Sequence, residues 1–92
     1  MKPIRWSAEK SLSLKEERGV SFEEVLSAIS QDGLLSVMEH PNRAKYGHQK
    51  MLVVRIREYA YLVPYVESEH EIFLKSIIPS RKATRDFLSG DK

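Results

Sequence analysis

The sequence lacks cysteine and long apolar runs, and it has only four prolines and four glycines in 92 residues. The missing cysteine excludes disulfides, thiolate nucleophiles and cysteine zinc sites. Nothing approaches the apolar length of a membrane span, and Arg5, Glu9 and Lys10 interrupt the stretch where a signal peptide carries its apolar core. The few prolines and glycines exclude a low-complexity chain. We therefore expect one cytoplasmic globular domain over residues 1–92, with no membrane partner.

Charge is unevenly distributed, although the formal net charge is only +2. Residues 40–57 carry five Lys or Arg and no Asp or Glu. Such a basic stretch attracts a polyanion, and a solvated loop with a strand edge has the same composition. The residues concerned are Arg43, Lys45, Lys50, Arg55 and Arg57, with His40 and His48 among them.

The first third of the chain predicts a short strand and two helices. Ser7 is a suitable N-cap for a helix over residues 8–18, which Gly19 ends. Ser21 and Glu24 have the spacing of a capping box for a second helix over residues 22–30. The expected buried stripe of that helix is formed by Phe22, Val25, Leu26 and Ile29, at helical spacing.

The remainder predicts strands and one more helix. A strand at 34–38 is followed by a polar loop, and residues 51–57 and 59–66 form a hairpin with a tight turn near Glu58. A third strand of the meander is expected at 72–78, and a helix from about Ser80 to near Gly90. Pro64 lacks an N–H and predicts an edge position or a bulge. The fold class is thus α+β, with two N-terminal helices, an antiparallel β-meander and a C-terminal helix.

Several short motifs occur in a familiar order: Trp6, Lys10, the stretch from Gly19 to Glu24, and Ser80-Arg81-Lys82-Ala83-Thr84. Together they resemble the BrnT-type toxins of bacterial type II toxin–antitoxin pairs, small ribonucleases of the RelE/ParE-like superfamily. The resemblance implies a RelE/ParE-like fold and a metal-independent, cofactor-free endoribonuclease that inhibits translation. It also implies a neutralising antitoxin of the ribbon-helix-helix type, through which alone the chain would reach operator DNA.

Metal-independent RNA cleavage needs a general base, a general acid and cations around the phosphate. Tyr65 and Glu67 match a Tyr-x-Glu that the family has at a strand end, and strand alternation places both on one face. Glu67 is the candidate base, Arg81 its neighbour or the phosphate clamp, and His48 the candidate acid. Phosphate or RNA contacts are expected from Lys45, Lys50, Arg55, Arg57, Tyr65, Lys82 and Arg85.

Less specific interpretations of the same residues stay open. A strand-end Glu67 is commonly an exposed ion pair, with Arg81 as one available partner, and Lys82 can lie on the helix surface. Arg55 and Arg57 can be the solvent face of a half-buried strand whose other face holds Leu52, Val54 and Ile56. No histidine or carboxylate cluster has metal-ligand spacing, so no metal site is expected.

Two other functions also stay open. The chain could keep the fold without nuclease chemistry, as a gyrase inhibitor like ParE or as a regulator that acts on DNA only with its antitoxin. Alternatively, the basic stretch could be the interface for an acidic segment of a partner.

Overall fold

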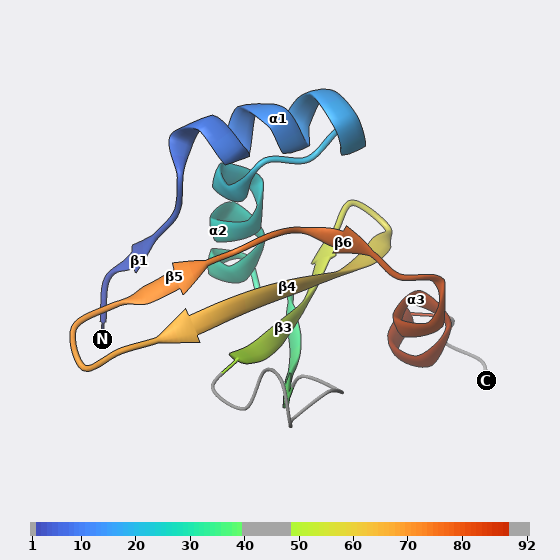
Figure 1. Cartoon of the computed structure of the whole chain (residues 1–92). Helices are drawn as coiled ribbons and strands as arrows, with labels where there is room; N and C mark the ends of the chain where they lie inside the picture. The colour runs from blue at the N-terminus through green and yellow to red at the C-terminus, as the bar shows by residue number, and fades with distance from the viewer. Residues whose placement is uncertain (1, 40–48, 89–92) are drawn as a thin grey trace.

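The computed structural model describes residues 2–39 and 49–88, which form one mixed sheet with helices packed on both of its faces (Figure 1). The predicted α+β class is confirmed. In chain order the elements are β1 (Ile4–Arg5), α1 (Ala8–Arg18), α2 (Phe22–Ser30), β2 (Leu34–Glu39), β3 (Gln49–Ile56), β4 (Tyr59–Glu67), β5 (Ile72–Leu74), β6 (Ile78–Pro79) and α3 (Arg81–Leu88). The predicted C-terminal end of the last helix, near Gly90, lies outside the described residues.

Local sequence signals set the first two helices as predicted. The Ser7 hydroxyl accepts the Lys10 N–H, and Gly19 ends α1 in the left-handed conformation with φ 76°. The capping box of α2 is complete, because the Ser21 hydroxyl accepts the Glu24 N–H while the Glu24 carboxylate accepts the Ser21 N–H. These caps satisfy backbone groups that have no partner inside the helices.

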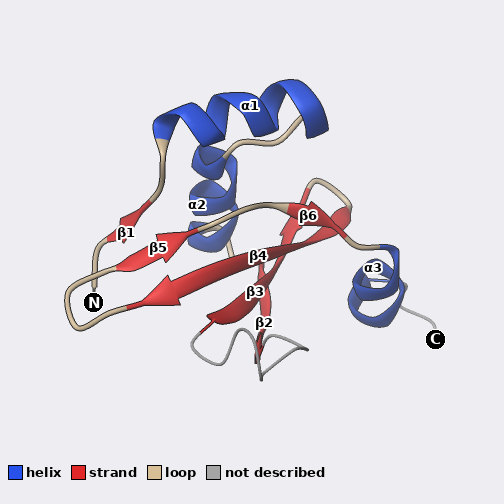
Figure 2. Ribbon diagram, in the orientation of Figure 1, coloured by secondary structure: helices blue, strands red, loops and turns tan. Residues whose placement is uncertain are grey.

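The sheet order is β1-β5-β4-β3-β2, with β6 also pairing to β4 (Figure 2). The pairs from β2 to β5 are antiparallel, as predicted for the meander. However, β1 pairs in parallel with β5, with Ile4 beside Ile72, so the prediction of an antiparallel sheet is wrong at this strand. A two-residue strand has no sequence pattern that reveals its direction.

The predicted third strand over residues 72–78 is two separate strands, β5 and β6, both lying beside β4. Pro64 explains where the first one stops. Its carbonyl accepts the Lys75 N–H at 2.8 Å, but proline has no N–H to return to the ladder. Pro64 is buried opposite Met51, and the β3–β4 register passes through it without the expected bulge. On the other side of β4 the ladder is interrupted at Pro64, because β5 pairs with residues 65–67 and β6 with residues 61–62.

The core has two layers, one on each face of the sheet. On the first face α1 and α2 cover the sheet through Leu14, Phe22 and Val25, and Trp6 packs on Phe22 with ring centroids 6.0 Å apart. On the second face α3 covers Val53 and Ala60 through Ala83. Leu26 was expected in the buried stripe of α2, but it is 40% exposed and lies outside the core of the first face.

Candidate functional site

Three of the predicted site residues lie together on the first face of the sheet. Lys50 of β3 stands directly opposite Tyr65 of β4, and Glu67 follows two residues later on the same face. Lys2, just before β1, reaches across β5 and places its Nζ 2.7 Å from Glu67 Oε2 and 2.7 Å from the Ser68 carbonyl oxygen. Sequence patterns gave no signal for Lys2, because this contact joins residues 65 positions apart.

The electrostatics of this group follow from those positions. The hydrogen bond from Lys2, then its charge, and more weakly the charge of Lys50, hold the pKa of Glu67 below its ordinary 4.5. The pKa of Tyr65 is raised above its ordinary 10.0, first by burial and then by the Glu67 charge. At neutral pH this arrangement favours a carboxylate beside a protonated phenol.

Tyr65 is only 6% exposed, and its hydroxyl makes no hydrogen bond within the described residues. Among those residues no buried side-chain nitrogen or oxygen lacks a hydrogen-bond partner. The hydroxyl therefore keeps some access to solvent. Within the same part of the chain, Glu67 Oε1 also accepts no hydrogen bond, so the group presents a free acceptor and a free donor.

An apolar hollow of about 790 Å³ lies between α2 and β1. Ile4 in its wall pairs with Ile72, which pairs with Glu67, so the hollow lies two strands, roughly 10 Å, from Glu67. The hollow is lined by Ile4, Leu26 and Ile29, with Glu23, Ser27 and Ser30 around them.

The cations predicted at the C-terminal helix lie elsewhere. Pro79, which precedes α3 by two residues, pairs with Tyr61 at the far end of β4 from Glu67. Six residues of strand separate those ends, roughly 20 Å. The predicted pairing of Glu67 with Arg81 is therefore wrong, and Glu67 pairs with Lys2 instead.

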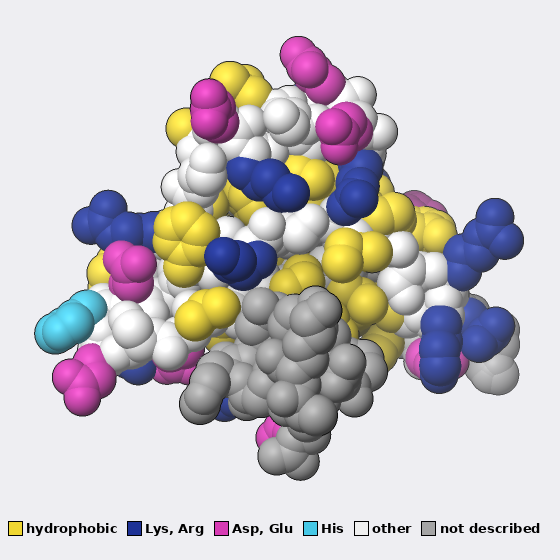
Figure 3. Space-filling model, viewed as in Figure 1, with side chains coloured by type: hydrophobic (Ala, Val, Ile, Leu, Met, Phe, Trp, Pro, Cys, Tyr) yellow, Lys and Arg dark blue, Asp and Glu magenta, His cyan; other side chains and the backbone are white. Residues whose placement is uncertain are grey.

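On α3 the basic side chains face outward. Ser80 caps the helix by accepting the Ala83 N–H, next to the predicted start of the helix at about Ser80. Lys82 and Arg85 both contact Asp86, at 3.1 and 3.7 Å, and Arg81 is exposed without an ion pair in the described part of the chain. Figure 3 shows Lys and Arg side chains gathered over α3, on the right of that view.

Arg55 and Arg57 do not share one strand face. Arg57 is in the β3–β4 turn with φ 58°, so its prediction as a strand residue is wrong. Arg55 is exposed on the second face, two residues after Val53 and opposite Ala60, which packs on Ala83 of α3. Val53 is fully buried under α3, so the second face of β3 is partly a core face and not only exposed to solvent.

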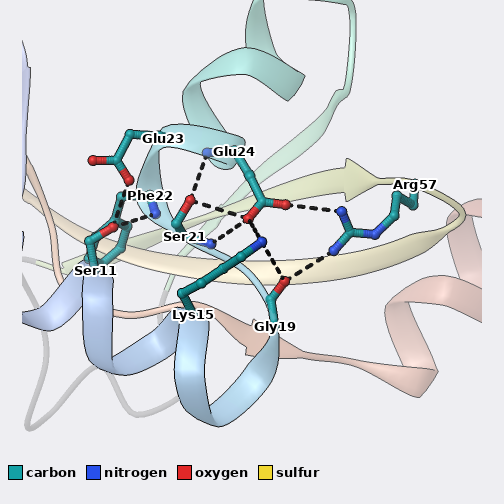
Figure 4. Close-up of polar contacts among 8 residues, drawn as sticks. All are labelled: Ser11, Lys15, Gly19, Ser21, Phe22, Glu23, Glu24 and Arg57. Carbon is teal, nitrogen blue, oxygen red and sulfur yellow. Dashed lines mark hydrogen bonds and ion pairs between the residues drawn. The ribbon is translucent and has the colours of Figure 1, made fainter.

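Arg57 belongs to a polar network that ties α1, α2 and the β3–β4 turn together (Figure 4). Its guanidinium donates to Glu24 Oε1 at 3.0 Å and to the Gly19 carbonyl at 3.2 Å, while Lys15 Nζ lies 2.7 Å from Glu24 Oε2. Burial, the largest single effect, raises the pKa of Glu24, but the bonds from Lys15 and Arg57 outweigh it and lower the pKa overall. The capping box indicated Glu24, whereas Arg57 was expected at an RNA contact and not in this network.

Two predicted site residues, Lys45 and His48, lie outside the described residues. Within residues 2–39 and 49–88 no group of three or more His, Asp or Glu side chains is placed to hold a metal ion. No helix in this part of the chain is long and apolar enough to cross a membrane.

Comparison with protein-family models, with curated proteins and with solved structures finds no match for this chain. Arguments about function therefore rest on its own residues and their geometry.

Proposed function

We propose that this chain is the toxin of a bacterial type II toxin–antitoxin pair, of the BrnT type with a RelE/ParE-like fold, and that it cleaves RNA without a metal. The observation that carries the proposal is the group of Lys50, Tyr65 and Glu67 on one face of the sheet, with a free carboxylate oxygen and an accessible phenol side by side. A base, a proton donor and a cation are the groups that phosphodiester cleavage by an internal hydroxyl requires.

In the proposed reaction Glu67 Oε1 takes the proton of the ribose 2′-hydroxyl. The 2′-oxygen attacks the adjacent phosphorus, forming a P–O bond to a 2′,3′-cyclic phosphate while the bond to the 5′-oxygen breaks. The leaving oxygen takes a proton, for which His48 is the candidate acid. Lys50 stabilises the charge on the phosphoryl oxygens, and Tyr65 donates a hydrogen bond to one of them.

The pKa shifts suit these roles. Because Lys2 and Lys50 lower the pKa of Glu67, the carboxylate is deprotonated and ready to accept a proton at neutral pH. Because burial and Glu67 raise the pKa of Tyr65, the phenol keeps its proton and acts as a donor.

Cations away from the cleavage site would hold the rest of the RNA. Arg55 and Arg81 are exposed on the α3 side, and neither makes an ion pair in the part of the chain that the structure describes. Lys82 and Arg85 share one acidic neighbour, Asp86, so the helix keeps a positive excess. In this proposal Arg81 contributes to binding along the RNA backbone and does not touch the reacting phosphate.

The test is incubation of the purified chain with free RNA in the presence of a metal chelator. Glu67→Gln should lower the cleavage rate by about 100-fold or more, because general-base catalysis contributes at least that much. Glu71→Gln is the matched control, since the two carboxylates are similarly exposed, at 39% and 37%, and each pairs with one cation. Arg81→Ala should weaken RNA binding and leave the cleavage rate at saturating RNA nearly unchanged.

Equal activity of Glu67→Gln and Glu71→Gln would remove Glu67 from the mechanism. Intact RNA with the wild type, together with inhibited DNA supercoiling, would instead support a gyrase inhibitor with the same fold. Cleavage only when ribosomes are added would keep the nuclease proposal and restrict its substrate to translated RNA.

A further inference from the structure

The outer sides of α1 and α2 leave two large apolar side chains uncovered. Leu12 of α1 is 69% exposed and Leu26 of α2 is 40% exposed, and neither belongs to the core of the first face. A second hollow, of about 540 Å³, lies between α1 and the start of α2. Glu23 lines this hollow as well as the apolar hollow between α2 and β1, so the two adjoin there. Together they form the α1–α2 groove.

The walls of the groove have the residue spacing of a surface on which a helix docks. On each of the two helices, four wall residues lie at positions i, i+3, i+4 and i+7, so they form one continuous stripe. These residues are Ala8, Ser11, Leu12 and Lys15 on α1 and Glu23, Leu26, Ser27 and Ser30 on α2. Most of them are small, which leaves room beside the two leucines for another helix to approach. An amphipathic helix in such a groove places apolar side chains over the leucines at the same spacing.

The rim of the groove is acidic. Glu9 precedes Leu12 by three residues and Glu16 follows it by four, so all three share one side of α1, whereas Lys10 points away from Leu12. Glu9, Glu16 and Glu23 are exposed, and none of them makes an ion pair in the described part of the chain. Figure 3 shows acidic side chains over α1, at the top of that view.

Cations beside the groove are already paired. Lys15 Nζ lies 2.7 Å from Glu24 Oε2, and Arg5 Nε lies 3.2 Å from Glu71 Oε1. The groove therefore repels an RNA backbone and attracts a segment that carries Lys or Arg. A second copy of this chain could offer its basic helix α3. Among the described residues, however, α3 exposes one large apolar side chain, Phe87, which would leave one of the two hollows unfilled.

We propose that the α1–α2 groove binds an amphipathic helix of a partner protein. Apolar side chains of that helix cover Leu12 and Leu26, and its Lys or Arg side chains pair with Glu9, Glu16 and Glu23. This inference is independent of the nuclease proposal, because the groove contains none of the residues assigned to catalysis or to RNA binding.

The probe is a synthetic peptide of about 14 residues, long enough to populate a helix, with leucine at i, i+3, i+4 and i+7 and arginine beside that stripe. Labelled for fluorescence anisotropy, it should bind the purified chain, and bind more weakly as salt is raised. The double variant Leu12→Ser, Leu26→Ser should bind it about tenfold more weakly. The matched control is Val37→Ser, Phe87→Ser, which removes side chains that are 51% and 42% exposed on β2 and α3 and should leave binding unchanged.

The acidic rim is tested within one helix. Glu16→Gln should weaken binding of the arginine peptide at low salt by about twofold to fivefold, the usual contribution of an exposed ion pair. Glu17→Gln removes the same charge from the next position, which is turned away from Leu12, and should leave the affinity unchanged.

The proposal is overturned if the wild type does not bind the peptide, if the two double variants bind it equally, or if a peptide with glutamate in place of arginine binds equally well. A dimer of the wild type that Leu12→Ser, Leu26→Ser abolishes, while the control variant keeps it, would also overturn it, because a second copy would then fill the groove. RNA cleavage is measured on the same proteins. Intact RNA with normal peptide binding would reject the nuclease proposal alone, and cleavage without peptide binding would reject the groove proposal alone.

Discussion

At the scale of single residues, Lys2 tunes the proposed general base. Its ammonium is the largest cause of the lowered pKa of Glu67, first through a hydrogen bond at 2.7 Å and then through its charge. A lowered pKa keeps the carboxylate ionised at lower pH, but it also makes Glu67 a weaker base. In the proposed mechanism, Lys2 therefore lowers the proton affinity of Glu67 and widens the pH range over which this carboxylate is ionised.

Replacing the ammonium tests this directly. Lys2→Met keeps the aliphatic stem and should move the pKa of Glu67 up toward its ordinary 4.5. The acidic limb of the pH profile of kcat/KM should then move to higher pH, because protonated Glu67 cannot act as a base. Arg5→Met, which removes the cation that pairs with Glu71, should leave that limb in place. An unmoved limb in Lys2→Met would mean that another group limits the rate at low pH.

At the scale of elements, two glycines connect α2 to its neighbours for different reasons. Gly19 ends α1 with φ 76°, and a side chain there would meet open space. Gly33 has no such φ, but a Cβ would lie 2.6 Å from the Ala28 carbonyl oxygen and 2.9 Å from that of Arg55. Gly33 also donates to Ala28 and accepts from the Arg55 N–H, both at 2.7 Å, so it joins the end of α2 to β3.

We therefore expect the two glycines to respond differently to alanine. Gly19→Ala should lower the free energy of unfolding by about 1–2 kcal/mol, the cost of a left-handed alanine. Gly33→Ala should cost more, about 3 kcal/mol or above, because two backbone carbonyls must move and core packing with them. Denaturant unfolding of both variants measures the difference. A smaller loss for Gly33→Ala than for Gly19→Ala would show that α2 can shift away from β3 cheaply.

At the scale of the whole molecule, sequence patterns predicted the parts that depend on near neighbours. The helix bounds follow from Ser7, Gly19 and the Ser21–Glu24 capping box, and the hairpin follows from β-branched residues on either side of a tight turn. Contacts between distant segments have no pattern in the local sequence that would predict them. Three features depend on how the fold brings distant segments together. They are the parallel pairing of β1 with β5, the ion pair of Lys2 with Glu67, and the distance between Glu67 and Arg81. The candidate site was therefore only partly predictable. The resemblance indicated Tyr65 and Glu67, strand alternation placed them on one face, and the basic stretch indicated Lys50.

Acid stability follows from the network of Glu24, which joins α1, α2 and the β3–β4 turn. Because the folded pKa of Glu24 lies below its ordinary 4.5, this carboxylate stabilises the fold fully above the unfolded pKa. That contribution disappears as the pH falls through the folded pKa. Glu24→Gln should cost about 1–2 kcal/mol at pH 7, and the difference from the wild type should shrink steadily below pH 4.5.

Denaturant unfolding from pH 7 down to pH 3 measures this difference, with Glu16→Gln on the exposed side of α1 as the matched control. The control should leave the free energy of unfolding nearly unchanged at every pH. The Glu24→Gln variant should still lose stability in acid, since Ser11 holds the pKa of Glu23 low and Lys2 that of Glu67. If the gap between wild type and Glu24→Gln stayed constant in acid, the stabilisation by Glu24 would come from packing and neutral hydrogen bonds, and the ion pairs with Lys15 and Arg57 would contribute nothing net.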